Sequence, residues 1–417
     1  MSTRPKVLVI AYHFPPVQGS SGYLRTLKFV KYLPLSGFDP VVLTVHPRAY
    51  EASDSELLSQ IPASVEVHRV FALNAKKHLS FRGSYPSFLA LPDRMSSWIP
   101  AATLKALQLI RNDKAIKAIF STYPISSAHA IGLLVRKFSG LPWVADFRDP
   151  MWDEYVATGN LELRARQFIE RRSVANCSQA LVTTQGMKDL YHRRYPSVAE
   201  NRIRFLPNGY DEEDFAALQT ETKLPDAPFT FLHAGLLDPI DRDPAPFLQA
   251  VARLIEKNPQ RKNQIRIRFL APGNPELVSK PVAQLGLQQV VSIEGTLPYA
   301  AALAQMASSH VLLLFQGKSC DHQIPAKLYE YLRIGRPIFA LTTPHGETGR
   351  LVTASKAGQL ADLESVDAIY TSLEAQCKAL ELGQSLAHPT QEAAQAFSRQ
   401  HQAAELGRIL ATVTGGE

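Results

Sequence analysis

Short apolar runs alternate with helical patterns along almost the whole chain, and this alternation most constrains the fold. The first run, residues 6–12, is followed by a helical pattern over residues 22–33 and then by another apolar run. Such alternation predicts a parallel sheet with helices on both faces. The expected strands are residues 6–12, 40–45, 65–70, 118–123, 142–147, 180–184 and 203–207, then 229–235, 265–273, 291–297, 310–315 and 336–341.

The pattern restarts after "LPNGYDEEDF", near residue 210, and the 417 residues suffice for two domains that each bury a core. We therefore expect an α/β protein with two doubly wound, Rossmann-like parallel-sheet domains that face a cleft. The N-terminal domain is predicted over residues 1–210 and the C-terminal domain over 211–390. Residues 391–417 are expected to form a helix that packs back on the N-terminal domain.

The cysteines and the apolar segments indicate the cellular compartment of the protein. Cys177, Cys320 and Cys377 form no Cys-x-x-Cys pair, which favours a reducing compartment and no structural zinc. The apolar run at the start is short and lacks a small-residue cleavage site, so it predicts a strand and no signal peptide. No apolar segment approaches the ~20 residues that span a bilayer. We expect a cytoplasmic protein.

The charge is uneven along the chain. Residues 1–210 hold 27 Lys and Arg against 15 Asp and Glu, or +12, and the rest holds 18 against 23, or −5. A basic half indicates an anionic partner, such as a phospholipid surface, a lipid phosphate or nucleic acid. Nucleic acid is the least favoured, since no nucleic-acid-binding motif accompanies the charge. Residues 74–102, where basic residues and aromatics interleave, predict either a membrane contact or a partly buried loop.

Glycines follow the first strand of each expected domain. Gly19 and Gly22 precede a helix, so backbone N–H groups could receive an anion there, or the segment is an ordinary helix-entry turn. Gly235 directly follows a strand and Arg242 lies a few residues beyond, which suits a diphosphate. Asp241 and Asp243 flank Arg242, an arrangement that binds a divalent metal in some proteins but is common by chance.

Charged residues crowd two further segments. Asp146, Arg148 and Asp149 end the strand in "VADFRDP", where they either form a site or cap one another. In "QIPAKLYEYLRIGRPIFA", Pro325 and Gly335 predict a helix of about three turns. Lys327 and Glu330 share one face of that helix, which in isolation predicts only a surface ion pair of ~0.2–0.5 kcal/mol.

Taken in order, five segments make the chain resemble the two-domain GT-B glycosyltransferases, specifically the large retaining family 4-like group typified by bacterial polysaccharide and phosphatidylinositol mannosyltransferases. The segments are "FPPVQGSSGYLRTLKFVKYLPLSGFDPVVLT", "GLPWVADFRDPMWDEY", "LPNGYDEEDF", "HAGLLD" and "IPAKLYEYLRIGRPIFA". The resemblance covers nearly the whole chain. It implies a sugar transferase whose donor is a nucleotide diphosphate sugar.

The resemblance also implies roles for single residues. Glu330 would bind the ribose hydroxyls of the donor, and Gly235, Arg242 and Lys327 would hold its diphosphate. Gly19 and Gly22 would line the cleft from the N-terminal side. Asp146, Arg148 and Asp149 would be the catalytic residues and position the acceptor.

Two positions depart from the family pattern. His322 stands where such enzymes often carry a Glu that contacts the transferred sugar, and Arg148 stands where relatives often have His. The identity of the donor sugar is therefore open.

The resemblance thus implies a metal-independent, retaining hexosyltransferase-type enzyme without a cofactor. Its expected acceptor is a lipid-linked sugar or a glycan in cell-surface polysaccharide biosynthesis, at the inner face of the membrane. The alternatives are a nucleotide-sugar epimerase of the same architecture, and a non-catalytic partner protein with the GT-B fold.

Overall fold

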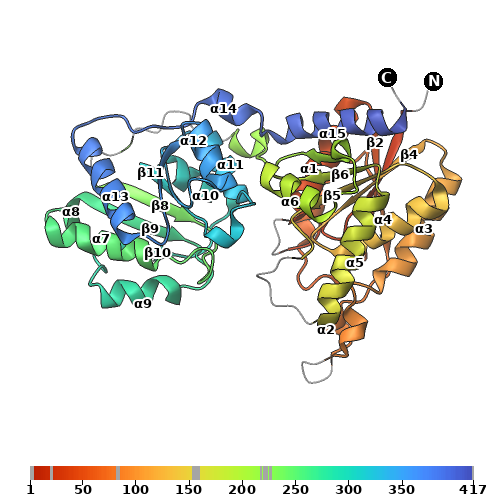
Figure 1. The fold of residues 1–417 in the computed structure, drawn as a ribbon, viewed down its shortest axis with the longest axis horizontal. Helices are drawn as coiled ribbons and strands as arrows, with labels where there is room; N and C mark the ends of the chain where they lie inside the picture. Colours follow the sequence, from red (N-terminus) through yellow and green to blue (C-terminus); the bar gives the residue numbers. More distant parts are fainter. Residues whose placement is uncertain are drawn as a thin grey trace. The chain divides into compact units, whose positions relative to one another are not determined.

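The structure is a computed structural model that describes residues 4–18, 22–80, 85–152, 160–216, 218, 224 and 228–415. It divides the chain into two compact units, each built on a parallel sheet (Figure 1). Unit 1 comprises residues 1–207 and 399–417, and unit 2 comprises 208–398. The boundaries expected from the sequence were 210 and 391.

Unit 1 has a seven-stranded sheet in the order β3-β2-β1-β4-β5-β6-β7, and every recorded pairing is parallel. The order reverses between β1 and β4, so their carboxyl ends flank the switch point where ligands bind in such sheets. The strands are β1 (Lys6–Ile10), β2 (Asp39–Val45), β3 (Glu66–Val70), β4 (Ile116–Thr122), β5 (Trp143–Arg148), β6 (Gln179–Val182) and β7 (Ile203–Phe205).

Helices cover both faces of this sheet. One hydrophobic cluster joins the sheet to α3, α4, α5 and α6, and another joins its opposite face to α1 and α15. The helices of unit 1 are α1 (Gly22–Tyr32), α2 (Ala75–His78), α3 (Trp98–Asn112), α4 (Ser126–Ser139), α5 (Asn160–Asn176), α6 (Gln185–Arg194) and α15 (Arg399–Thr414).

Unit 2 repeats the design with a six-stranded parallel sheet in the order β10-β9-β8-β11-β12-β13 and a switch point between β8 and β11. Its strands are β8 (Phe229–Ala234), β9 (Ile265–Leu270), β10 (Val291–Glu294), β11 (Val311–Phe315), β12 (Ile338–Leu341) and β13 (Gly358–Ala361). Its helices are α7 (Ala245–Lys257), α8 (Arg261–Gln264), α9 (Glu276–Gln284), α10 (Tyr299–Ala307), α11 (Ala326–Ile334), α12 (Glu347–Ala354), α13 (Val366–Glu381) and α14 (Gln391–Gln395).

The predicted fold class is confirmed, and each expected strand overlaps a strand of the structure. One strand, β13, had no prediction, and the single C-terminal helix expected over 391–417 is wrong. The chain forms α14, leaves the helix at Phe397 and Ser398, and starts α15 at Arg399. Phe397 packs on Tyr329 with ring centroids 5.0 Å apart, and Ser398 forms a β-bridge with Tyr210. These tertiary contacts hold the break.

Candidate active site

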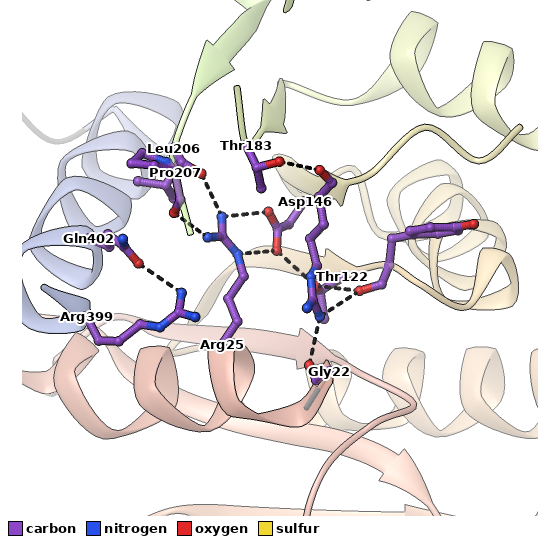
Figure 2. A network of polar contacts seen from close by, with 11 residues as sticks. Gly22, Arg25, Thr122, Asp146, Thr183, Leu206, Pro207, Arg399 and Gln402 are labelled. Carbon is purple, nitrogen blue, oxygen red and sulfur yellow. Dashed lines mark hydrogen bonds and ion pairs between the residues drawn. The ribbon is translucent and has the colours of Figure 1, made fainter. Parts of the chain in front are cut away.

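At the carboxyl edge of the first sheet, Asp146 is fully buried and bound by an arginine of α1 (Figure 2). Arg25 Nε and Nη2 donate to its two carboxylate oxygens, each over 3.0 Å, and Thr122 Oγ1 donates over 2.9 Å. Arg25 also donates to the carbonyl oxygens of Leu206 and Pro207, over 3.0 and 2.6 Å. The bidentate pair and its neighbouring hydrogen bonds therefore fix α1, β4, β5 and the residues that follow β7 to one another.

The geometry gives Asp146 a different role from the one expected. Both of its oxygens accept hydrogen bonds from the protein and none of its surface is exposed. A buried carboxylate with these partners stabilises the edge of the sheet, so we assign Asp146 to structure instead of substrate contact. Sequence reasoning missed Arg25, whose only signal was a charge on the apolar face of a predicted helix.

Arg148 lies at the end of β5 with a backbone φ of +60°. Its Nη1 donates to the carbonyl oxygens of Gly22, over 2.7 Å, and Tyr123, over 3.2 Å, while Thr183 Oγ1 donates to the Arg148 carbonyl. Burial, the largest effect, lowers the pKa of Arg148, and the Arg25 charge adds to it, while Asp146 and Asp149 act in the opposite direction. Arg148 is thus a half-buried cation held at the switch point of the sheet.

The structure describes two of the other three residues predicted for this edge, Gly22 and Asp149. Gly22 is the first residue of α1 and contributes its carbonyl oxygen to Arg148. Asp149 is half-buried, and its N–H donates to the Phe147 carbonyl over 2.6 Å. Gly19 lies outside the described residues, so its predicted role in the cleft stays a prediction.

A histidine that the sequence analysis did not single out belongs to the same edge. His13 follows β1, and its Nδ1 is buried without a hydrogen-bond partner among the described residues. Burial first, and then the charge of Arg148, lower the pKa of His13 to about 4. A neutral imidazole beside a fixed arginine is therefore present at neutral pH. Its only sequence signal was its position directly after the first strand.

At the switch point of the second sheet, Gly235 and Lys327 are packed against each other. Gly235 follows β8 with a φ of +107°, and a Cβ at this position would lie 3.0 Å from Lys327 Nζ. The Gly235 N–H donates to the Leu270 carbonyl over 2.8 Å, so it is engaged within the sheet. Glycine is thus required both for its backbone conformation and for the close approach of the lysine.

Lys327, in the first turn of α11, is surrounded by basic groups. Its Nζ lies 3.3 Å from Nε2 of the fully buried His233, whose two ring nitrogens are each 3.0 Å from a backbone carbonyl oxygen. Removal from water, followed by the charge of Arg242, lowers the pKa of Lys327 to about 7, although Glu330 acts in the opposite direction. Arg242, Lys327 and Gly235 therefore lie at one edge and present a cationic surface.

Glu330 lies one turn further along α11 and accepts a hydrogen bond from the hydroxyl of Tyr299 over 2.7 Å. The helix itself is positioned by Tyr331, whose hydroxyl accepts from the Ala234 N–H over 3.2 Å. In the sequence, Tyr331 is one of several apolar side chains of the predicted helix, and nothing there marks its hydroxyl as a hydrogen-bond partner. Its hydroxyl fixes α11, and with it Glu330, to the end of β8.

Asp241 and Asp243 are used within the loop that carries Arg242. The Asp241 carboxylate accepts from the Ser319 hydroxyl, and Asp243 accepts from the Ala245 N–H over 2.9 Å at the start of α7. Asp238 makes an ion pair with Arg242 at 3.8 Å. Across the part of the chain that the structure describes, no group of three or more His, Cys, Asp and Glu residues is arranged to hold a metal ion.

His322 is half-buried in the loop before α11. The neighbouring Asp321 accepts from the Thr343 hydroxyl over 2.5 Å and its carbonyl accepts from the Glu347 N–H over 2.8 Å. The Asp321 carboxylate, next to His322, is thus hydrogen-bonded to the loop that precedes α12. His322 remains the residue predicted to contact the transferred sugar.

Residues 24–209 match the family model of the glycosyl transferase 4-like domain. The chain is therefore similar to a glycosyl transferase 4-like domain over these residues, which make up most of unit 1. This confirms the resemblance that the five sequence segments indicated. The matched residues fall within unit 1, except for the last two.

Solved structures share the fold over the whole chain at low identity. Sucrose-phosphate synthase from Thermosynechococcus elongatus is 15% identical with a TM-score of 0.65, and the match covers 99% of this chain and 100% of that one. HepE from Anabaena, solved with UDP and glucose, is 16% identical with a TM-score of 0.64, covering 98% and 100%. WaaG, a glycosyltransferase involved in lipopolysaccharide biosynthesis, is 15% identical with a TM-score of 0.61, covering 99% and 100%.

No curated protein sequence gives a significant match. None of the helices in the described part of the chain has both the length and the apolar character that crossing a bilayer requires.

Proposed function

We propose that the protein is a retaining glycosyltransferase that moves a sugar from a nucleotide diphosphate sugar to a lipid-linked or glycan acceptor in cell-surface polysaccharide biosynthesis. The observation that carries the proposal is the grouping of Gly235, Lys327, Arg242 and Glu330 at the switch point of unit 2. Two cations at this edge suit a diphosphate, and the Glu330 carboxylate, about one helical turn further along α11, suits the ribose diol of a nucleotide.

The donor site works by charge. Arg242 and Lys327 stabilise the diphosphate as its negative charge grows during departure from the sugar. Glu330, held by Tyr299, accepts hydrogen bonds from the ribose hydroxyls, since a carboxylate is an acceptor only. HepE was solved with UDP, which makes uridine nucleotides the first donors to test.

The acceptor site is assigned to unit 1. Arg148 is held beside the neutral His13, and Asp149 follows it in the chain, so a cation, a base and a carboxylate stand at one edge. Arg148 binds a phosphate or a hydroxyl of the acceptor, and His13 accepts the proton of the acceptor hydroxyl. No metal or cofactor takes part, and the protein works at the inner face of the cell membrane as a peripheral protein.

The test is a product assay with UDP-glucose and other nucleotide sugars, with and without a bacterial lipid extract as acceptor, in the presence of EDTA. A transferase releases UDP and forms a glycolipid only when the extract is present, and NMR of the product reports a retained anomeric configuration.

The other outcomes contradict the proposal. Conversion of the sugar nucleotide without acceptor would identify an epimerase. Nucleotide binding by calorimetry without turnover of any donor would favour a non-catalytic partner protein. Activity lost in EDTA and restored by Mg²⁺ or Mn²⁺ would contradict metal independence.

A further inference from the structure

The helices α3, α4 and α5 form a layer on one face of unit 1 (Figure 1). These three helices hold eight Lys and Arg residues, two Glu residues and no Asp. Of the two carboxylates, Glu170 is fully buried and Glu162 pairs with Arg166. The charge that this layer presents to its surroundings is therefore positive.

A groove of about 630 Å³ runs between the last turns of α4 and α5. Three apolar side chains line it, those of Leu133, Leu134 and Phe168. The cations are Arg136, Lys137 and Arg172, and none of the described residues that line the groove is acidic. A groove lined by both apolar and cationic side chains fits a ligand that has an anionic head and an apolar chain.

Large apolar side chains project from the same layer. Leu104, Phe138, Leu161 and Phe168 are exposed by 70, 64, 55 and 48%. The Arg172 guanidinium lies 5.5 Å from the centroid of the Phe168 ring, and the Lys137 ammonium lies 5.7 Å from that of Phe138. Exposed aromatics beside cations are typical of surfaces that lie at the boundary between lipid headgroups and acyl chains.

We propose that the outer surface of α3, α4 and α5 binds an anionic phospholipid bilayer, and that the groove between α4 and α5 receives one lipid. The lipid phosphate lies between Lys137 and Arg172, and the upper part of an acyl chain contacts Leu133 and Phe168. The charge of the surface is complementary to anionic headgroups, which attract basic residues near the membrane.

The position of the groove separates it from the candidate active site. The helix α4 starts after the carboxyl end of β4 and runs back along the sheet, so its last turns lie at the opposite edge from Arg148. The groove is therefore a docking site and no part of the acceptor site. A second copy of the chain is a poorer occupant, because a two-fold contact would place this positive surface against itself.

Residues 74–102, for which the sequence left open a membrane contact or a partly buried loop, fit the second interpretation. Trp98 of this segment is fully buried, and Lys77 Nζ donates to the Tyr50 carbonyl over 2.6 Å. Phe81 and Arg82 lie outside the described residues. The segment is thus partly buried, as its alternative interpretation held, and the basic layer of α3 to α5 is the better membrane surface.

The test is flotation of the whole protein with vesicles of phosphatidylcholine alone or of phosphatidylcholine with phosphatidylglycerol. We expect binding only to the anionic vesicles, weakened by salt. Each basic residue near such a surface contributes roughly fivefold, so Lys137→Glu with Arg172→Glu should lower the partition coefficient by at least about 30-fold. The matched control is Lys262→Glu with Lys378→Glu, two exposed lysines of unit 2, which changes the net charge by the same amount and should change binding by less than about twofold.

A second variant tests the apolar side chains. Phe138→Ser with Phe168→Ser should weaken the binding that persists at high salt, where charge attraction is screened. Equal binding to both kinds of vesicle, equal losses in the two charge-reversal variants, or a dimer by light scattering that Lys137→Glu with Arg172→Glu dissolves would each overturn the inference.

The inference rests on the proposed function for its role in the cell, yet its test needs neither donor nor acceptor. Calorimetry with UDP-glucose on the same variants separates the two proposals. Loss of vesicle binding with intact nucleotide binding is the result expected of a docking surface in unit 1. Vesicle binding that persists while no donor binds or turns over would contradict the proposed function and leave the membrane surface standing.

Discussion

Binding of a nucleotide sugar should take up a proton, because the site contains a lysine that is partly neutral before the donor arrives. Lys327 faces His233 of β8, Arg242 of the following loop and Glu330 of its own helix. Burial and the Arg242 charge lower the pKa of Lys327 to about 7. The pKa of His233 lies well below its usual value, through burial and then the Lys327 charge, so His233 stays neutral and does not add to the effect.

The magnitude follows from the two protonation states. At a pH of about 7.5, a group with a pKa of about 7 is protonated in roughly a quarter of the molecules. An anion within ~4–6 Å raises the pKa of a cationic partner by about 1–3 units, so Lys327 is almost fully protonated in the complex. Roughly 0.7 proton is taken up. The affinity is therefore highest below the free pKa and falls about tenfold between a pH of about 7 and about 8.5.

The assay is calorimetric titration with UDP-glucose in buffers of equal pH and different ionisation enthalpy. The slope of the observed enthalpy against the buffer enthalpy gives the number of protons. UDP-glucose is preferred to UDP, whose terminal phosphate itself titrates with a pKa of ~6. Lys327→Met removes the titrating group, and Lys327→Arg replaces it by a cation that is always charged. Both should reduce the uptake to about zero, whereas Lys262→Met, an exposed lysine of unit 2, should leave it unchanged.

Two results would refute the assignment to Lys327, and a third would refute the direction of proton transfer. One is an affinity of the unaltered protein that does not change between a pH of about 7 and about 8.5. The other is a proton uptake that persists in Lys327→Arg, which would place the titrating group elsewhere. A tight complex that releases protons would also contradict the sign derived from Lys327.

Three further substitutions have distinct expected results. Glu330→Ala should weaken nucleotide binding by about 10–100-fold in calorimetry, since a hydrogen bond to a charged group contributes ~1.5–3 kcal/mol. Asp146→Asn should lower the free energy of unfolding in denaturant titrations by roughly 3–5 kcal/mol, because it leaves the Arg25 guanidinium buried without its ionic partner. Gly235→Ala should destabilise the fold by about 1–2 kcal/mol through its positive φ, and should also weaken nucleotide binding by displacing Lys327.

Matched controls separate these effects from general damage. Glu392→Ala removes an exposed carboxylate from α14 and should leave nucleotide affinity unchanged. Gly383→Ala introduces the same kind of backbone strain, at a φ of +65° with open space around the new Cβ, and should leave binding intact. If Asp146→Asn kept full stability and lost turnover, Asp146 would be a substrate contact after all.

Most of the strands were predictable because buried parallel strands are rich in apolar residues. In β11 all five residues are buried, and the sequence shows them as one uninterrupted apolar run. The strand β13, "GQLA", has no such run, and only its pairing with β12 makes it a strand. The end of α11 at Gly335 was also predictable, since the αL conformation at a helix end selects glycine and Gly335 has a φ of +79°.

The partners of the charged residues were not predictable. Asp146 and Arg25 are separated by 121 positions, and the sequence contains no sign that one neutralises the other. Tyr331 carries an apolar ring and a hydroxyl. Its position on the apolar face of the helix indicated burial but did not indicate that its hydroxyl accepts a hydrogen bond from the Ala234 N–H. Spacing reveals which faces are buried, whereas pairing across the fold depends on the tertiary structure.

Unit 2 is inserted between Pro207 and Arg399, so the chain enters and leaves it next to the paired residues Tyr210 and Ser398. The Tyr210 N–H donates to the Phe397 carbonyl over 3.1 Å, which keeps entry and exit side by side. Such a unit can be exchanged as a whole during evolution, because the chain crosses between the two units at only two adjacent positions, and only their pairing has to be preserved. Recombination at these joints would transfer the whole of unit 2, with Gly235, Lys327 and Glu330, to a different unit 1.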